Sequence, residues 1–171
     1  MATSEYFFDL QDRVDPGSNA PGTTTTTSAA AATTNTMQVR IFTLDFDQTT
    51  DEDTSWEFPV PANYLSGGTV LISWFATPTS GNVILKASVY VATASSSDID
   101  TSAAYNTVDT SGAVAVPGTS GQFKQTSIAL TSPGLAAGRW ASLTIGRDAN
   151  AGGDTAAGDV RVIGVSFQYT S

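Results

Sequence analysis

The residues best suited to hold a metal ion lie in a polar segment near the end of the sequence. Asp148, Asn150, Asp154 and Asp159 offer the hard oxygen ligands that calcium prefers. Their spacing does not match an EF-hand loop, whose bidentate glutamate is missing. A solvated hairpin loop, in which Asp and Asn close their own turns, explains the same residues. We therefore expect no metal and no cofactor, with this loop as a weak calcium candidate.

A second acidic group could in principle supply the paired carboxyls of a glycosidase. Its members are Asp45, Asp47, Asp51, Glu52, Asp53 and Glu57. Glycosidases need two carboxyls that face each other across a cleft. These residues crowd one strand end and turn, where most would point into solvent. We expect them to keep a sheet edge from pairing with a wrong strand.

Nucleophilic catalysis has no support in the residue types. The sequence contains no histidine and no cysteine, so the commonest general base and the thiol nucleophile are missing. Serine and threonine are plentiful, but neither Lys86 nor Lys124 belongs to an S-x-x-K motif. We therefore predict that the protein is not an enzyme and has no catalytic residue.

The aromatic residues could instead form a platform on which sugar rings stack. They are Trp56, Trp74, Trp140, Tyr64 and Tyr90. Trp56 and Trp74 alternate in step with apolar neighbours, so core packing explains them at least as well. Trp140 alternates with Ser142 and Thr144, which indicates a less apolar face. Trp140 is the better contact residue, and burial under a neighbouring subunit is its favoured environment.

The elements that position these residues are short β-rich runs separated by Gly, Pro, Ser, Asn and Asp. Strands are expected within residues 37–46, 56–60, 69–76, 82–94, 122–131, 139–147 and 159–169. A bulge near Ile41 would keep the first run facing inward, and a short helix could cover Ser97 to Tyr105. Such spacing without long helices predicts an all-β, antiparallel β-sandwich. A jelly roll is the first expectation and an immunoglobulin-like sandwich the second.

The first 36 residues differ from the rest. A Thr and Ala tract at residues 23–36 cannot bury enough apolar surface to offset its ordering entropy. We expect residues 1–36 to form an extended N-terminal arm and residues 37–171 the sandwich domain. The aromatic cluster of the arm would fill a pocket of a neighbouring subunit; it consists of Tyr6, Phe7, Phe8 and Leu10. The alternative is that the arm folds back along its own domain.

Charge and hydropathy narrow the classes of partner. A net charge of -9 with only seven Lys and Arg disfavours nucleic acid and anionic lipid. No segment approaches the roughly 20 apolar residues that span a bilayer, and the first ten residues lack a secretory pattern. We expect a soluble protein that is assembled in the cytoplasm, with neither nucleic acid nor membrane as a partner.

Two stretches resemble known sequences over roughly the last two thirds of the chain. They are Trp56 to Pro61 with Tyr64 and Gly67 to Val70, and Arg147 to Asp159 followed by Val160 and Val165 to Tyr169. These stretches look like small virion structural proteins of tailed bacteriophages. The resemblance implies a jelly-roll-like module on the particle surface, such as a capsid decoration (cement) protein or a tail or fibre component.

The resemblance and the arm together predict a non-enzymatic virion structural protein on the capsid surface. It would bind the outside of the assembled head, with the major capsid protein and copies of itself as partners, as a trimer. Its partner-binding residues would be Tyr6, Phe7, Phe8, Leu10 and Trp140. The alternative is a carbohydrate- or receptor-binding module of a tail or fibre. In that case Trp140, Tyr64 and the loop from Asp148 to Asp159 would meet a sugar.

Overall fold

A computed structural model gives the fold and describes residues 1–27, 40–100, 103–131 and 133–171. Every regular element in these residues is a β-strand, and every strand pair is antiparallel. The strands are β1 (Thr3–Phe8), β2 (Gly22–Thr27), β3 (Arg40–Phe46), β4 (Glu52–Pro59), β5 (Ser66–Ala76), β6 (Asn82–Val83), β7 (Leu85–Ala92), β8 (Asp109–Thr110), β9 (Val114–Ala115), β10 (Lys124–Ala129), β11 (Trp140–Arg147) and β12 (Val160–Thr170). The described residues contain no helix of the length and hydropathy that a bilayer crossing requires.

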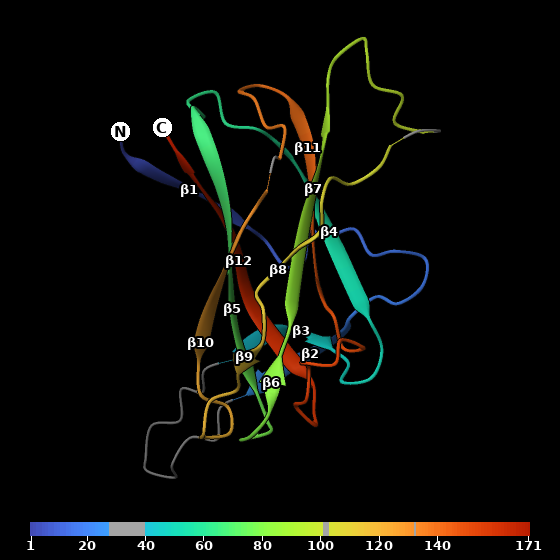
Figure 1. Cartoon of the computed structure of the whole chain (residues 1–171), viewed down its shortest axis with the longest axis vertical. Helices are drawn as coiled ribbons and strands as arrows, with labels where there is room; N and C mark the ends of the chain where they lie inside the picture. The colour runs from blue at the N-terminus through green and yellow to red at the C-terminus, as the bar shows by residue number, and fades with distance from the viewer. Residues whose placement is uncertain (28–39, 101–102, 132) are drawn as a thin grey trace.

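The strands form two main sheets (Figure 1). The larger sheet has the order β10-β5-β12-β3-β2, and β1 pairs with the other half of β12. The smaller sheet has the order β4-β11-β7-β8, and β6 and β9 form a separate ribbon. Strands that follow one another in sequence mostly alternate between the sheets, which gives the sets β3-β12-β5-β10 and β4-β11-β7-β8. This is the jelly-roll arrangement. The predicted all-β antiparallel sandwich is confirmed, with the jelly roll as its topology.

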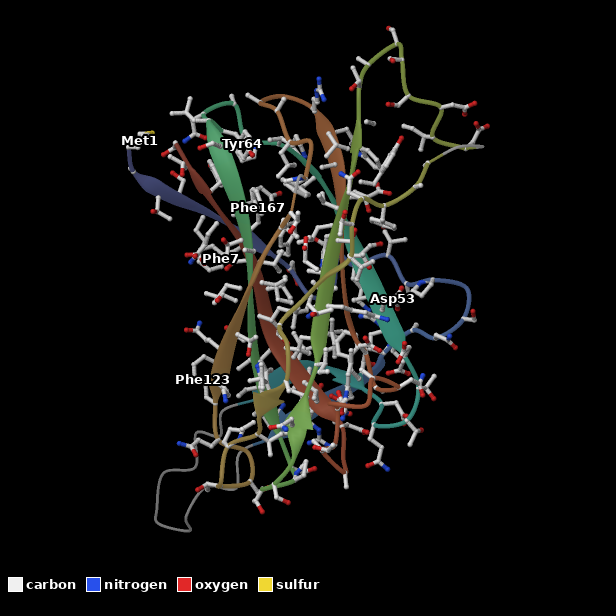
Figure 2. All side chains as sticks on the ribbon, viewed as in Figure 1. Met1, Phe7, Asp53, Tyr64, Phe123 and Phe167 are labelled. Atoms are coloured by element: carbon white, nitrogen blue, oxygen red, sulfur yellow. The ribbon has the colours of Figure 1, made fainter. Side chains whose placement is uncertain are left out.

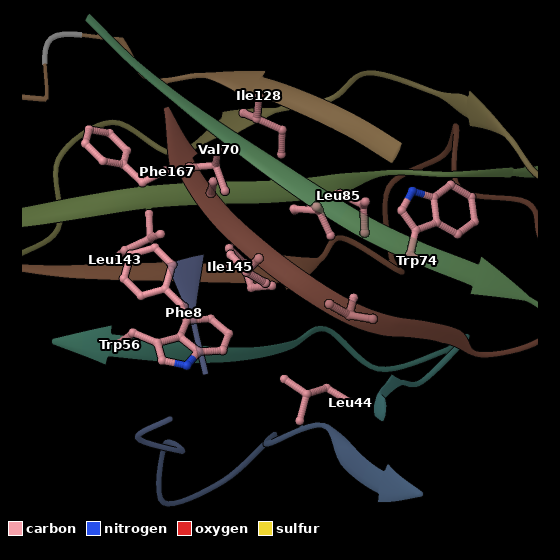
Figure 3. Packing of buried hydrophobic residues seen from close by; sticks show 14 of the residues in the cluster. Phe8, Leu44, Trp56, Val70, Trp74, Leu85, Ile128, Leu143, Ile145 and Phe167 are labelled. Carbon is pink, nitrogen blue, oxygen red and sulfur yellow. The ribbon is translucent and has the colours of Figure 1, made fainter. Parts of the chain in front are cut away.

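The core lies between the two sheets (Figure 3). It is built from every second residue of each strand, because alternate side chains of a strand point to opposite faces. Trp56 is 2% exposed and Trp74 is 0% exposed, so both belong to this core. The indole N–H of Trp56 donates to the carbonyl oxygen of Asp9 at 2.7 Å, and that of Trp74 to Oγ1 of Thr126 at 2.9 Å. Both tryptophans are therefore buried with their polar atoms satisfied.

The described part of residues 1–36 is not a free arm. β1 pairs with β12, β2 pairs with β3, and Val14 forms a bridge with Ser55. Phe8 and Leu10 are each 8% exposed and belong to the core. The chain thus follows the alternative in which this segment folds back along its own domain, because alternating aromatics on a paired strand find their apolar partner within the chain. The predicted boundary at residue 36 and the end of the Thr and Ala tract lie outside the described residues.

The short helix predicted over Ser97 to Tyr105 is not found in the described residues of that segment. A capping serine accepts from an N–H group two or three residues ahead. Oγ of Ser97 instead accepts from the backbone N–H of Thr93, four residues behind, at 2.9 Å. The serine therefore closes a turn that follows β7, and the described residues between this turn and β8 form no helix or strand.

The register shifts of the larger sheet occur at different places from the predicted bulge. The β2–β3 pairing runs through Ile41 without a register shift, whereas β12 shifts register against β5 between Val162 and Gly164 and again between Gln168 and Thr170. Val160 and Val162 therefore face the core ahead of the shift at Gly164. After that shift, Val165, Phe167 and Tyr169 face the core.

The two ends of the chain meet at one end of the molecule (Figure 1). Ala2 and Ser171 exchange both backbone hydrogen bonds, at 3.2 and 3.0 Å. The pairing of β1 with the end of β12 therefore extends to Ala2 and Ser171.

Candidate functional site: a groove along β11

The outer face of the smaller sheet carries four rows of side chains. The register of β4, β11 and β7 gives the rows Pro59–Trp140–Ala92, Glu57–Ser142–Tyr90, Ser55–Thr144–Ser88 and Asp53–Gly146–Lys86. Ala141, Leu143 and Ile145 of β11 are buried in the core, so the alternate residues of this strand face outward. The face is polar at one end and aromatic at the other.

Three hollows follow one another along this face. The first, of about 360 Å³, is lined by Asp53, Lys86 and Gly146 at the polar end of the rows. The second, of about 260 Å³, lies over Ser142, and the third, of about 520 Å³, lies beside Trp140. Tyr105 lines the first and second hollows, and Ile99 and Trp140 line the second and third. We call these three hollows together the β11 groove.

Described residues between β7 and β8, among them Ile99, Ala103 and Tyr105, form one wall of the β11 groove. Oγ of Ser88 donates to the carbonyl oxygen of Asn106 at 2.9 Å, and the backbone N–H of Asn106 donates to that of Val89 at 3.0 Å. These bonds hold the segment against the outer face of β7. Tyr105 is thereby placed across the groove, where its hydroxyl lies 2.9 Å from Oγ of Ser142.

Two aromatic rings meet at the other end of the groove. Trp140 and Tyr90 have ring centroids 6.1 Å apart and an interplanar angle of 71°, an edge-to-face contact. Both side chains are only partly buried. A ring fixed by an edge-to-face neighbour keeps its own orientation, and its remaining surface is accessible to a ligand.

The charged groups of the groove are mostly acidic. Asp51, Asp53 and Asp148 line the first hollow and Glu57 lines the second. Lys86 Nζ lies 3.6 Å from an oxygen of Asp51. Within the described residues, no hydrogen bond or ion pair engages the carboxylates of Asp53, Glu57 or Asp148. These carboxylates are available as hydrogen-bond acceptors.

The acidic group seen in the sequence is divided by the strand geometry. Asp53 and Glu57 lie on the outer face of β4, whereas Glu52 shares the inward parity of Thr54 and Trp56. Burial raises the pKa of the Glu52 carboxyl, which accepts a hydrogen bond from the backbone N–H of Asp47 at 2.7 Å. The β11 groove therefore contains only part of this acidic group.

The predicted partner-binding residues do not lie together. Trp140 lines the groove, whereas Phe8 and Leu10 are buried in the core and Tyr6 packs against Phe8. Phe7 is 74% exposed and lines a small hollow of about 80 Å³ on the outer face of the other sheet. Figure 2 shows the place of Phe7 beside the larger sheet. The structure thus corrects the prediction that Phe8 and Leu10 are anchors for a partner, because the core of this chain already takes up their side chains.

Tyr64 does not join Trp140 in the groove. Its hydroxyl donates to the carbonyl oxygen of Gly67 at 2.6 Å, and its ring stacks on Phe167 with centroids 6.5 Å apart. Burial raises the pKa of the Tyr64 hydroxyl. Tyr64 therefore belongs to the aromatic packing of the larger sheet, at a distance from Asp53 beside β4 (Figure 2).

The loop proposed for calcium is organised by an arginine instead. The guanidinium of Arg147 donates to both carboxylate oxygens of Asp154, at 3.0 and 2.7 Å. The side-chain amide of Asn150 donates to Asp51 at 3.1 Å, and burial with nearby acidic residues raises the pKa of Asp159. The described residues contain no group of three or more acidic side chains placed to hold a metal ion. The four candidate ligands are thus not brought to one point.

Sequence reasoning missed Tyr105, Glu57 and Lys86 as neighbours in one groove. The parity of Trp140 with Ser142 was the signal that pointed to this face. Tyr105 gave none, because its position depends on hydrogen bonds between the segment after β7 and the sheet.

No family model and no curated protein matches the sequence. Among solved structures, TmCBM61 in complex with β-1,4-galactotriose is similar at 13% identity, with a TM-score of 0.38 and coverage of 99% of this chain and 88% of that chain. CBM27-1 of Caldicellulosiruptor saccharolyticus, in complex with mannohexaose, has 7% identity, a TM-score of 0.40 and coverage of 95% and 96%. A Paenibacillus sp. cycloisomaltooligosaccharide glucanotransferase has 13% identity, a TM-score of 0.35 and coverage of 90% of this chain but 18% of that chain.

Proposed function

We propose that this protein is a non-catalytic carbohydrate-binding module whose ligand lies in the β11 groove. The observation that carries the proposal is the combination of partly exposed Trp140 and Tyr90 with Glu57 and Asp53 on one hollowed sheet face. Such a surface offers the two kinds of group that bind a sugar ring, namely aromatic rings and carboxylates. The flat C–H faces of the sugar pack on aromatic rings, and the sugar hydroxyl groups donate hydrogen bonds to carboxylates.

The rigidity of the groove floor supports the same proposal. The floor is the antiparallel strand β11, paired on both sides, so its side chains are held in fixed positions without a ligand. A preformed site binds with a smaller entropy cost than one that must order on binding. Most ligand sites of proteins are preformed in this way.

The virion location, the self-association and the capsid partners that the resemblance implies stay predictions. The attachment mechanism that used Phe8 and Leu10 is not part of our proposal, since both residues are in the core. A carbohydrate-binding role is compatible with a place in a phage tail or fibre, where the module would recognise a surface glycan. The absence of catalysis also stays a prediction.

Trp140→Ala tests the proposal. We expect affinity for a glycan that the wild type binds to fall by about tenfold or more, which corresponds to the loss of about 1.4 kcal/mol. Affinity electrophoresis in gels with soluble polysaccharides identifies the glycan, and isothermal titration calorimetry with its oligosaccharides measures the affinity.

Phe7→Ala is the matched control, because Phe7 is an exposed aromatic residue on the other sheet. This variant should bind as the wild type does. Equal losses in both variants, or glycan binding that survives Trp140→Ala unchanged, would contradict a site in the β11 groove.

A further inference from the structure

We infer that the β11 groove takes several consecutive sugar units of one linear chain, not a single sugar; this inference rests on the proposed function and specifies its ligand class. The starting observation is that the three hollows lie next to one another along β11. The first and second share Tyr105, and the second and third share Ile99 and Trp140. A ligand that follows β11 therefore meets the hollows in order, and it passes over Tyr105, which is 44% exposed, between the first and the second.

The length of the groove exceeds one sugar ring. Trp140 and Gly146 are six residues apart on β11, which corresponds to about 20 Å at the rise of an antiparallel strand. The third hollow continues beyond Trp140, where it is lined by Ala92, Thr93 and Arg139. None of the three hollows is an enclosed cavity, so none is shaped to surround one sugar or one chain end.

The two ends of the groove differ in chemistry. The end at Trp140 and Tyr90 offers ring surfaces, whereas the end at Asp53, Asp148 and Lys86 offers charged hydrogen-bonding groups. Tyr105 lies between them, with its hydroxyl 2.9 Å from Oγ of Ser142. A short ligand can contact only one of these ends. A longer chain gains stacking at one end and hydrogen bonds at the other.

Gly146 keeps the polar end of the groove free of bulk. A Cβ atom at this position would lie 2.5 Å from the carbonyl oxygen of Glu52 and 2.8 Å from Cε of Lys86. Only glycine therefore fits between β4 and the Lys86 side chain. The first hollow therefore remains open beside Gly146, where the bound sugar chain would lie.

Chain length is the variable that tests this inference. The probes are cello-, manno- and galacto-oligosaccharides of one to six units, and calorimetry measures their binding to the wild type and to three variants, Asp53→Ala, Asp12→Ala and Trp140→Ala. For the series that binds, we expect affinity to rise by about tenfold or more from two units to six. Asp53→Ala should remove most of that gain and leave the affinity for two units unchanged, because a short ligand occupies only the aromatic end.

Asp12→Ala is the matched control for Asp53→Ala. It removes the same charge from an exposed loop residue that does not line the groove, so it should leave the whole length dependence intact. Equal affinity for two and six units would overturn the inference, as would an equal effect of Asp53→Ala at both lengths; in each case loss of binding in Trp140→Ala would still support the proposed function. Wild-type binding that Trp140→Ala does not weaken would instead reject the site itself.

Discussion

At the residue scale, one buried arginine sets the shape of the loop between β11 and β12. The Arg147 side chain is 0% exposed, and it ends a strand whose other inward residues are apolar. Besides its paired bonds to Asp154, it donates to the carbonyl oxygens of Gly158 at 2.8 Å and Ala156 at 3.1 Å. One cation thus satisfies several acceptors of a loop that has no regular structure of its own.

Arg147→Met should destabilise the protein by about 3 to 5 kcal/mol, because it leaves the buried carboxylate of Asp154 without its cation and with only the backbone N–H of Ile84 as a donor. Urea unfolding followed by tryptophan fluorescence measures the loss. The double variant Arg147→Met with Asp154→Leu removes both charges and should regain part of the lost stability. A single variant as stable as the wild type would show that the pair does not hold the loop.

At the element scale, β1 and β2 make the N-terminal segment part of the larger sheet. Phe8 lies 5.2 Å from Phe58 and 5.7 Å from Trp56 between ring centroids, so β1 contributes to the core (Figure 3). Phe7, the preceding residue, faces the opposite way and is exposed. Two adjacent residues of one type therefore have opposite environments.

Phe8→Ala should lower the free energy of unfolding by about 3 to 5 kcal/mol, as for other buried phenylalanines. Phe7→Ala should change it by no more than about 0.5 kcal/mol, because its side chain is largely in solvent. Thermal and urea unfolding of the two variants make the comparison. If both losses were small, β1 would not be an integral strand of the domain.

Strand alternation explains how much of this fold could be predicted from the sequence. Trp56 and Phe58, or Val70 and Ile72, repeat with the period of a half-buried strand, so their burial follows from local pattern. The composition of residues 1–36 did not indicate which strand β1 pairs with, because the pairing of β1 with β12 joins segments from opposite ends of the chain. The outward orientation of Trp140 could be predicted from its position in the strand alternation. Its ring contact with Tyr90 could not, because that contact depends on the register of β7 and β11.

At the scale of the whole molecule, charge determines which glycans the proposed site would accept. The protein carries a net charge of -9, and Asp53, Glu57 and Asp148 in the groove make no ion pair in the described part of the chain. A polyanion would meet repulsion both during approach and in the groove. A neutral chain meets no such repulsion, and its hydroxyl groups can donate hydrogen bonds to these carboxylates.

Polygalacturonate should therefore not retard the protein in affinity electrophoresis at low ionic strength, where repulsion is screened least. A neutral polysaccharide that the wild type binds should retard it about equally at low and moderate salt. Retardation by polygalacturonate that disappears in Trp140→Ala would contradict this charge selectivity, because it would show an acidic chain bound in the groove.

The hydrogen bonds between Ala2 and Ser171 place the two ends of the domain side by side. A short peptide could join the two ends without moving β1 or β12, and a new start and end could then be opened in an exposed loop. Such a circular permutant would keep all strand neighbours. The same geometry means that, as an insert in another protein, this domain would interrupt its host at a single point.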